Sequence, residues 1–155
     1  MKTGRRLIAA ILWVAMSTLT LAVAEEHGTR EEAKALVDAA VEHVKKVGAE
    51  QAFKDFTTDK AHWMKKDLYV IAFDMTGVMH ANGVNEKMIG INHMQVRDPN
   101  GVMPTAEMAR LVQTKGEGWV DYMWQHPQTK KMAGKSTYVK KLVNYDGWVG
   151  VGIHR

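Results

Sequence analysis

Apolar residues recur at helical spacing over the first polar stretch of the chain, between residues 30 and 47. They lie three or four positions apart, at Ala33, Leu36, Val37, Ala40, Val41, Val44 and Val47. This spacing places them on one face of an α-helix. Thr29, with Glu32 three residues later, is typical of a capping box, and Gly48 is a favourable stop. We predict one amphipathic helix over residues 30–47 and a short second helix over 49–56.

The middle of the chain changes to a strand pattern. Residues 68–73 are continuously apolar, which is typical of a strand covered on both faces. A turn at 74–77 and a returning strand at 78–81 complete a predicted hairpin. The pattern then predicts loops at 57–66 and 84–100, a helix at 105–114, and strands at 119–124, 135–142 and 148–153. Short connections between the last strands favour antiparallel pairing.

These elements define the fold class. We predict an α+β fold in which a long N-terminal helix packs on a five- or six-stranded antiparallel sheet. The chain has 155 residues, the size of one domain, and shows no internal repeat.

The first 24 residues have the features of a signal peptide. Lys2, Arg5 and Arg6 precede an apolar segment over 7–23, and Ala22-Val23-Ala24 is a small-x-small cleavage site. We therefore predict a cleaved leader over 1–24, a single domain over 25–155, and a periplasmic or secreted location. An uncleaved membrane anchor is the alternative. After cleavage, no apolar run is long enough to span a membrane.

Charge and cysteine content exclude several classes of protein. Three of the 21 basic residues and none of the 17 acidic ones lie within 1–24, which leaves 18 basic and 17 acidic residues, a formal charge of +1. This balance does not favour nucleic-acid binding. The chain has no cysteine, which excludes thiol catalysis, iron–sulfur clusters and covalent c-type haem.

No motif of a catalytic or metal site is present. The sequence has no nucleophile elbow, P-loop, dinucleotide fingerprint or zinc-protease motif. The seven histidines are scattered without the i, i+3 or i, i+4 spacing of a helical metal site. We therefore predict no catalytic residue, no metal site and no cofactor. A metal- or haem-linked enzyme would require histidines that converge only in the fold.

An aromatic strand is the best candidate for a binding site. Tyr122 and Trp124 share one face of the strand at 119–124, and their polar tips suit a pocket wall. For Trp119 and Trp148 we favour ordinary core packing. Lys135 begins the following strand, where its ammonium is either a point charge for a ligand carboxylate or a solvated strand-end group.

An ordered set of segments resembles the single-Cache extracellular sensor family in its small periplasmic form. The segments cover most of the chain after the leader, and the stretch Gly-Trp-Val-Asp-Tyr followed by Lys-Ser-x-Tyr is the most specific. The set comprises residues 69–77, 80–82, 89–92, 97–101, 116–124, 127, 135–139 and 150–153.

This resemblance implies a PAS-like sheet and a small organic ligand, commonly a short carboxylate, bound on one sheet face. By position, the implied ligand-binding residues are His80, Tyr122, Trp124, Lys135 and Tyr138. Lys135 would face the carboxylate, Trp124 would form an apolar wall, and the others would donate hydrogen bonds. Lys135 and Tyr138 have opposite strand parity, so either a bulge intervenes or one of them does not contact the ligand.

The sequence also departs from the family pattern. Family receptors usually continue into a membrane helix and a kinase or methyl-accepting module, whereas this chain ends at Arg155. A membrane receptor or kinase is therefore the expected signalling partner. His154 replaces the usual penultimate aromatic residue, and His80-Ala81-Asn82 replaces the usual His-Pro. We expect a ligand-binding sensor domain without catalytic activity; the alternative is a structural or interaction domain on the same fold with no ligand.

Overall fold

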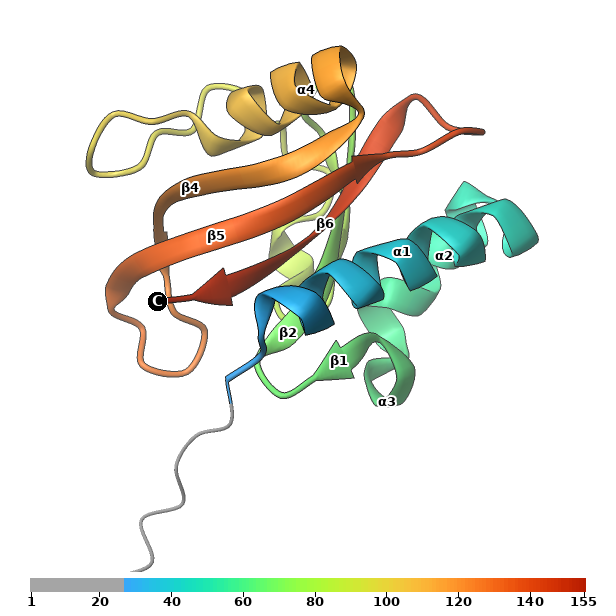
Figure 1. Cartoon of the computed structure of the whole chain (residues 1–155), viewed down its shortest axis with the longest axis horizontal. Coiled ribbons are helices and arrows are strands. Elements are labelled where there is room, and N and C mark those ends of the chain that lie inside the picture. Colours follow the sequence, from blue (N-terminus) through green and yellow to red (C-terminus); the bar gives the residue numbers. More distant parts are fainter. Residues whose placement is uncertain (1–26) are drawn as a thin grey trace, which may run out of the picture.

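The computed structural model describes residues 27–155 and shows an antiparallel sheet with helices on both faces (Figure 1). The predicted leader, residues 1–24, lies outside the described residues. Within residues 27–155, no helix is both long and apolar enough to cross a membrane. The helices are α1 (Arg30–Val47), α2 (Ala49–Thr58), α3 (Lys60–Trp63), the 3₁₀ helix η1 (Glu86–Met88) and α4 (Pro104–Lys115).

The strands are close to those expected from the sequence. They are β1 (Met64–Lys65), β2 (Leu68–Asp74), β3 (Met79–Asn82), β4 (Glu117–Gln125), β5 (Met132–Lys141) and β6 (Gly147–His154). The sheet has six strands in the order β1-β2-β6-β5-β4, with β3 also paired to β2, and every pairing is antiparallel. The predicted α+β class and five- or six-stranded antiparallel sheet are confirmed, with six strands present. The predicted loop at 57–66 instead contains the end of α2, the short helix α3 and β1.

The start of α1 forms the predicted capping box. The Thr29 hydroxyl accepts a hydrogen bond from the Glu32 backbone N–H at 3.1 Å, and the Glu32 carboxylate accepts one from the Thr29 N–H at 3.0 Å. The Thr29 bond, together with Lys66 and Lys65, lowers the pKa of Glu32 to about 2. This cap fixes the first turn of the helix that covers one face of the sheet.

Strand β2 is buried on both of its faces. Leu68, Val70 and Ala72 pack beneath α1 and α2, together with Val149 and Val151 of β6. The alternate residues point to the opposite face and pack with α4, where they meet Trp148 and Met108. Figure 1 shows α1 and α2 on one side of the sheet and α4 on the other. The sequence of β2 is continuously apolar over 68–73 because helices cover both faces of the sheet there.

The segment that follows β3, residues 83–103, connects the hairpin to α4. Its fixed point is the Asp98 carboxylate, which accepts hydrogen bonds from the backbone N–H groups of Val102 at 2.8 Å, Asn100 at 2.9 Å and Met123 of β4 at 2.9 Å. These bonds, with Met123 contributing most, hold the pKa of Asp98 below its ordinary value of 3.8. One side chain thus closes a turn and attaches it to the sheet edge.

Replacing Asp98 with asparagine is expected to reduce stability in a pH-dependent way. An amide presents one oxygen and an NH₂ group to three N–H donors, so one donor loses its acceptor. Because the folded pKa is lowered, the carboxylate stabilises the native state fully above pH 3.8, and this stabilisation is lost as the pH falls below that value. The melting temperature of Asp98→Asn should be lower at pH 7 and approach the wild-type value in acid. Asp146→Asn, in an exposed turn, is the control. If the melting temperatures of Asp98→Asn and the wild type differed by the same amount at all pH values, this explanation would be wrong.

Candidate functional site

A small, partly open cavity lies between the sheet and the α4 side of the molecule. Its volume is about 30 Å³, which accommodates about two water molecules. Strands β2, β3, β4 and β5 form its floor, and η1, the loop before α4 and α4 itself form its roof. The principal lining residues are Tyr69, Ile71, Phe73, Asn82, Met88, His93, Met108, Tyr122, Trp124 and Lys135.

The Lys135 ammonium is the charged group of this cavity. The residue is only 2% exposed, and its Nζ donates a hydrogen bond to the Tyr69 hydroxyl at 2.8 Å. The same Nζ lies 4.6 Å from the centre of the Tyr69 ring. Burial acts to lower the pKa of Lys135, but Tyr69, Tyr122 and Asp67 raise it overall. Within residues 27–155, no carboxylate forms an ion pair with it. A buried cation with only neutral hydrogen-bond partners is unusual.

The register of β5 explains how a lysine is accommodated here. Lys135 pairs with Tyr122 of β4 and with His154 of β6. A Cβ at Gly152 of β6 would lie 2.1 Å from the Lys135 Cε and 2.6 Å from the Thr137 hydroxyl oxygen. The absence of a side chain at Gly152 therefore provides the space for the lysine stem.

Two aromatic residues of β4 complete the wall that was expected from the sequence. The Tyr122 hydroxyl shares a hydrogen bond with the Thr137 hydroxyl at 2.8 Å, and burial raises the pKa of Tyr122. The Trp124 ring meets the Tyr122 ring edge-on, with centroids 5.9 Å apart. The structure thus brings Lys135, Tyr122 and Trp124 together.

Four polar residues of the cavity were not identified from the sequence: Tyr69, Asn82, His93 and Thr105. Tyr69 lies within the apolar run, although a tyrosine in a strand buried on both faces requires a partner for its hydroxyl, which was an available signal. Asn82 uses its side-chain oxygen to cap the turn after β3, accepting from Val84 N–H at 3.0 Å. His93 reaches the cavity from the loop before α4 and meets Phe73 edge-on. Neither Asn82 nor His93 carried a pattern that could place it.

An open groove adjoins the cavity and shares several of its walls. It has a volume of about 560 Å³ and is lined in part by Tyr69, Asn82, Met88 and Trp124, which also line the cavity. Lys87 and Lys130 lie at its exposed rim. A ligand entering from solvent would therefore pass two cationic side chains and then Met88 and Trp124.

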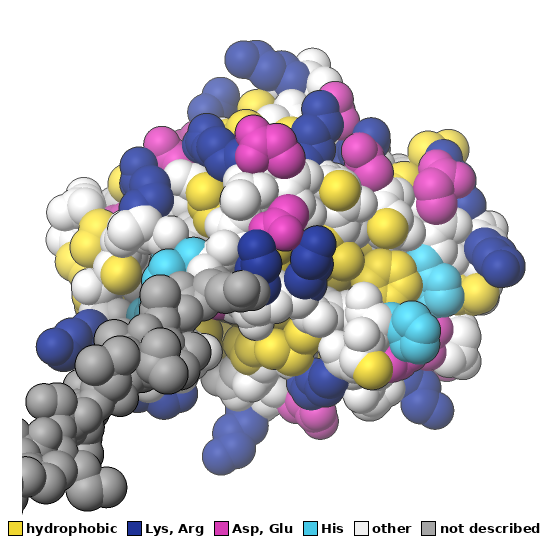
Figure 2. Space-filling view, turned by 60° about the horizontal axis from the view of Figure 1, so that its bottom comes forward, with side chains coloured by type: hydrophobic (Ala, Val, Ile, Leu, Met, Phe, Trp, Pro, Cys, Tyr) yellow, Lys and Arg dark blue, Asp and Glu magenta, His cyan; other side chains and the backbone are white. Residues whose placement is uncertain are grey.

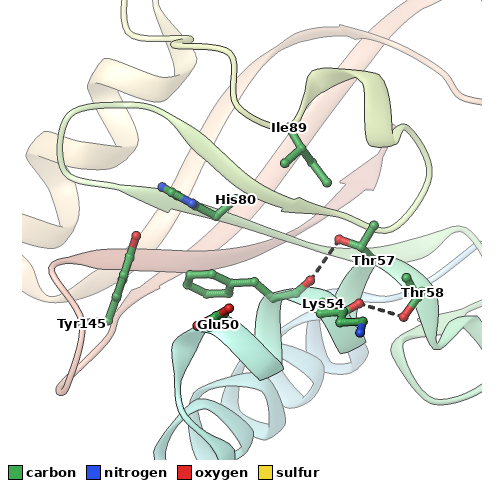
Figure 3. Close-up of a pocket in the computed structure, with 8 residues that line it drawn as sticks. Glu50, Lys54, Thr57, Thr58, His80, Ile89 and Tyr145 are labelled. Atoms are coloured by element: carbon green, nitrogen blue, oxygen red, sulfur yellow. Dashed lines mark hydrogen bonds between the residues drawn. The ribbon is translucent and has the colours of Figure 1, made fainter.

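His80 lies in a different depression, which Figure 3 shows between α2 and β3. This open groove, about 440 Å³, is also lined by Glu50, Thr57 and Tyr145. The His80 Nε2 is 2.7 Å from the Asp74 carboxylate, and its ring stacks on Phe53. Burial acts to raise the pKa of Asp74, but hydrogen bonds from His80, Thr76 and Val78 lower it overall. The groove is larger than the cavity, but its histidine is already paired.

Tyr138 lies on the opposite face of the sheet. The β4–β5 ladder continues without interruption from Lys135↔Tyr122 to Tyr138↔Trp119, so residues 135 and 138 point in opposite directions. The Tyr138 ring packs against Trp119 at 5.2 Å, under α1. Burial and the neighbouring Glu117 raise its pKa to about 12. Of the five residues expected at one site, the structure places His80 and Tyr138 away from the cavity that Lys135 lines.

His154, which replaces an expected aromatic residue, lies beside Lys135 at the end of β6. Its ring is 4.5 Å from that of His126, and both of its nitrogens are buried without a hydrogen-bond partner among the described residues. Burial, Lys135 and His126 together lower its pKa to about 4. The imidazole is therefore neutral at neutral pH.

Comparisons with known proteins agree with this architecture. A family model described as Single Cache domain 2 matches residues 9–154. The chain is similar to a methyl-accepting chemotaxis protein from Vibrio parahaemolyticus, with 24% identity over 80% of this chain and 86% of that chain and a TM-score of 0.69. It is also similar to a periplasmic sensor domain of a chemotaxis protein, with 26% identity over 78% and 91% and a TM-score of 0.66. A Cache chemosensory domain, solved in work on carboxylic acid recognition, shares 24% identity over 80% and 91%, with a TM-score of 0.68. The expected resemblance and PAS-like fold are confirmed.

Proposed function

Because the chain belongs to the single Cache domain 2 family of sensor domains, we propose that it binds a short carboxylate in the periplasm and has no catalytic activity of its own. The observation that carries this proposal is the buried Lys135 ammonium, which faces the cavity with only a tyrosine hydroxyl as its hydrogen-bond partner. An anionic ligand would supply the missing countercharge.

The walls of the cavity suit a small ligand with one polar end and a short apolar part. Tyr122 and Tyr69 place hydroxyls near Lys135, and Trp124, Met88 and Phe73 offer apolar surface for a short carbon chain. The cavity volume of about 30 Å³ requires that bound water leaves and that a side chain at the groove, such as Met88, moves aside. One solved Cache domain with the same fold is described by its recognition of carboxylic acids, which supports the same ligand class here.

The alternative, a Cache fold that binds no ligand, predicts a pocket filled by side chains. The small cavity volume is compatible with it, but the buried charge is not explained by it, since an apolar residue at 135 would fill the site at lower cost. The proposed partner of the ligand-bound domain is a membrane receptor or a kinase.

A panel of short carboxylates is expected to raise the melting temperature. A ligand that binds only the native state at about 100 times its Kd adds about 2.7 kcal/mol to the free energy of unfolding. For a domain of this size, that gain shifts the melting temperature by on the order of 10 °C.

The matched control for each acid is its primary amide, which has nearly the same shape without the charge. The amides should give no shift. If no acid stabilises the chain at millimolar concentration, or if the amides stabilise it equally, the proposal is wrong.

A further inference from the structure

Three metal-ligating side chains from distant parts of the sequence meet beside His154 of β6. His27 precedes α1, Asp67 precedes β2, and His126 follows β4. Each offers one ligand atom, and these atoms all lie within 4.8 Å of one another. We propose that His27, Asp67 and His126 bind a divalent transition-metal ion of the zinc class. This site is separate from the carboxylate pocket and does not depend on it.

The donor set suits this class of ion. Two imidazoles and one carboxylate are the three-ligand set of open zinc sites, and imidazole also suits nickel and copper. The Asp67 Oδ1 accepts a hydrogen bond from the Gly28 N–H at 2.6 Å, and its Oδ2 lies 3.0 Å from the His27 Nδ1. The carboxylate is thus fixed on one side and turned toward the histidine on the other. Its position is therefore already determined before an ion binds.

His126 is held in place by the turn that follows it. Its Nδ1 accepts hydrogen bonds from the backbone N–H groups of Gln128 and Thr129, both at 3.3 Å. These bonds are long and therefore weak, so they resist a small shift of the ring toward a bound ion only slightly. Metal binding should therefore change the environment of these two backbone amides.

His154 supplies an independent observation at the same place. Its ring lies against that of His126, and neither of its buried nitrogens has a hydrogen-bond partner among residues 27–155. Buried polar atoms without partners are rare in native proteins and require an explanation. A water bound to an ion held by the neighbouring three residues would give a nitrogen of His154 a hydrogen-bond partner.

Other histidine–aspartate contacts in the described chain do not have this arrangement. His43 pairs with Asp55, His62 with Asp59, and His80 with Asp74. None of these pairs has a further histidine, aspartate or glutamate close enough to complete a group of three. The His27 side chain is about half exposed, at 54%, which leaves a route for an ion from solvent. Histidine side chains reach the surface beside the point where the described chain begins (Figure 2).

The experiment is a titration of the tag-free full chain with zinc chloride, followed by calorimetry and by NMR of the backbone amides. We expect saturable binding of one equivalent, with shifts at Gln128 and Thr129. His27→Ala, Asp67→Asn and His126→Ala should each weaken binding at least about tenfold, since even the loss of a supporting group usually costs that much. His27 is exposed before α1, so its variant should fold normally even if the others do not.

The matched control is His62→Ala, which removes the histidine of an exposed histidine–aspartate pair in α3. Its zinc affinity should equal that of the wild-type chain. The proposal is overturned if zinc binding is not saturable, or if His27→Ala and His126→Ala bind zinc as tightly as His62→Ala does.

Discussion

Replacing Lys135 with methionine is expected to abolish carboxylate binding while the chain remains folded. The methionine side chain keeps most of the lysine stem, which lies over Gly152, and removes only the charge. Removing one partner of a buried charge pair typically costs about 2–5 kcal/mol of affinity. A loss of this size changes micromolar binding to millimolar or weaker. Calorimetric titration with the acid that gives the largest thermal shift measures the effect.

Lys140→Met provides the matched control on the same strand. Lys140 points to the other face of the sheet, where it pairs with Asp38 at 2.7 Å and Glu117 at 3.2 Å. Its replacement removes the same charge from β5 without altering the cavity, so affinity should be unchanged. Removing the buried charge at 135 should leave stability equal or higher, because the ammonium has no carboxylate partner in the described structure. Unchanged affinity in Lys135→Met would show that this lysine does not bind the ligand.

Trp148→Ala is expected to be the most destabilising single substitution. Trp148 is fully buried, and its ring stacks on Phe73 with centroids 5.3 Å apart. Truncating a buried tryptophan to alanine costs about 3–5 kcal/mol through lost packing and the cavity left behind. Because whole-domain stability is about 5–15 kcal/mol, this change removes a large share of it. Urea unfolding with an unchanged m-value measures the loss.

Trp148→Phe separates packing from hydrogen bonding. The Trp148 Nε1 is buried without a hydrogen-bond partner among the described residues. The indole N–H therefore lowers the free energy of unfolding instead of raising it. Phenylalanine retains a stacked ring and removes this group, and it should be much less destabilising than alanine. If Trp148→Phe and Trp148→Ala lowered the free energy of unfolding equally, ring packing would not be what stabilises this position.

The elements of the fold follow from local patterns in the sequence. Thr29, Glu32 and Gly48 defined α1 because capping depends on neighbours three residues apart, and the bounds of that helix agree with the prediction. The run at 68–73 identified β2 because burial on both faces leaves no polar position. The segment 57–66 was predicted as a loop, since a four-residue helix and a two-residue strand are too short to produce a period.

The site could be predicted only in part, because it is made by contacts between distant residues. Strand parity correctly indicated that Lys135 and Tyr138 face opposite ways, and the unbroken ladder shows it. Position alone could not show that His80 turns toward Asp74. Likewise, His27 and His126 lie far apart in the sequence, and no motif links them. Their proximity depends on how the strand ends are arranged, which no local pattern encodes.

The empty position at Gly152 has a consequence for related sequences. The Lys135 stem occupies the volume that a side chain at 152 would need, so the two positions share one space across adjacent strands. A relative with short residues at both 135 and 137 has room for a methyl group at 152, whereas a relative with lysine at 135 does not. The residues at positions 135 and 152 should therefore vary together among related sequences. A lysine at 135 should therefore occur together with a glycine at 152, even where the ligand is unknown.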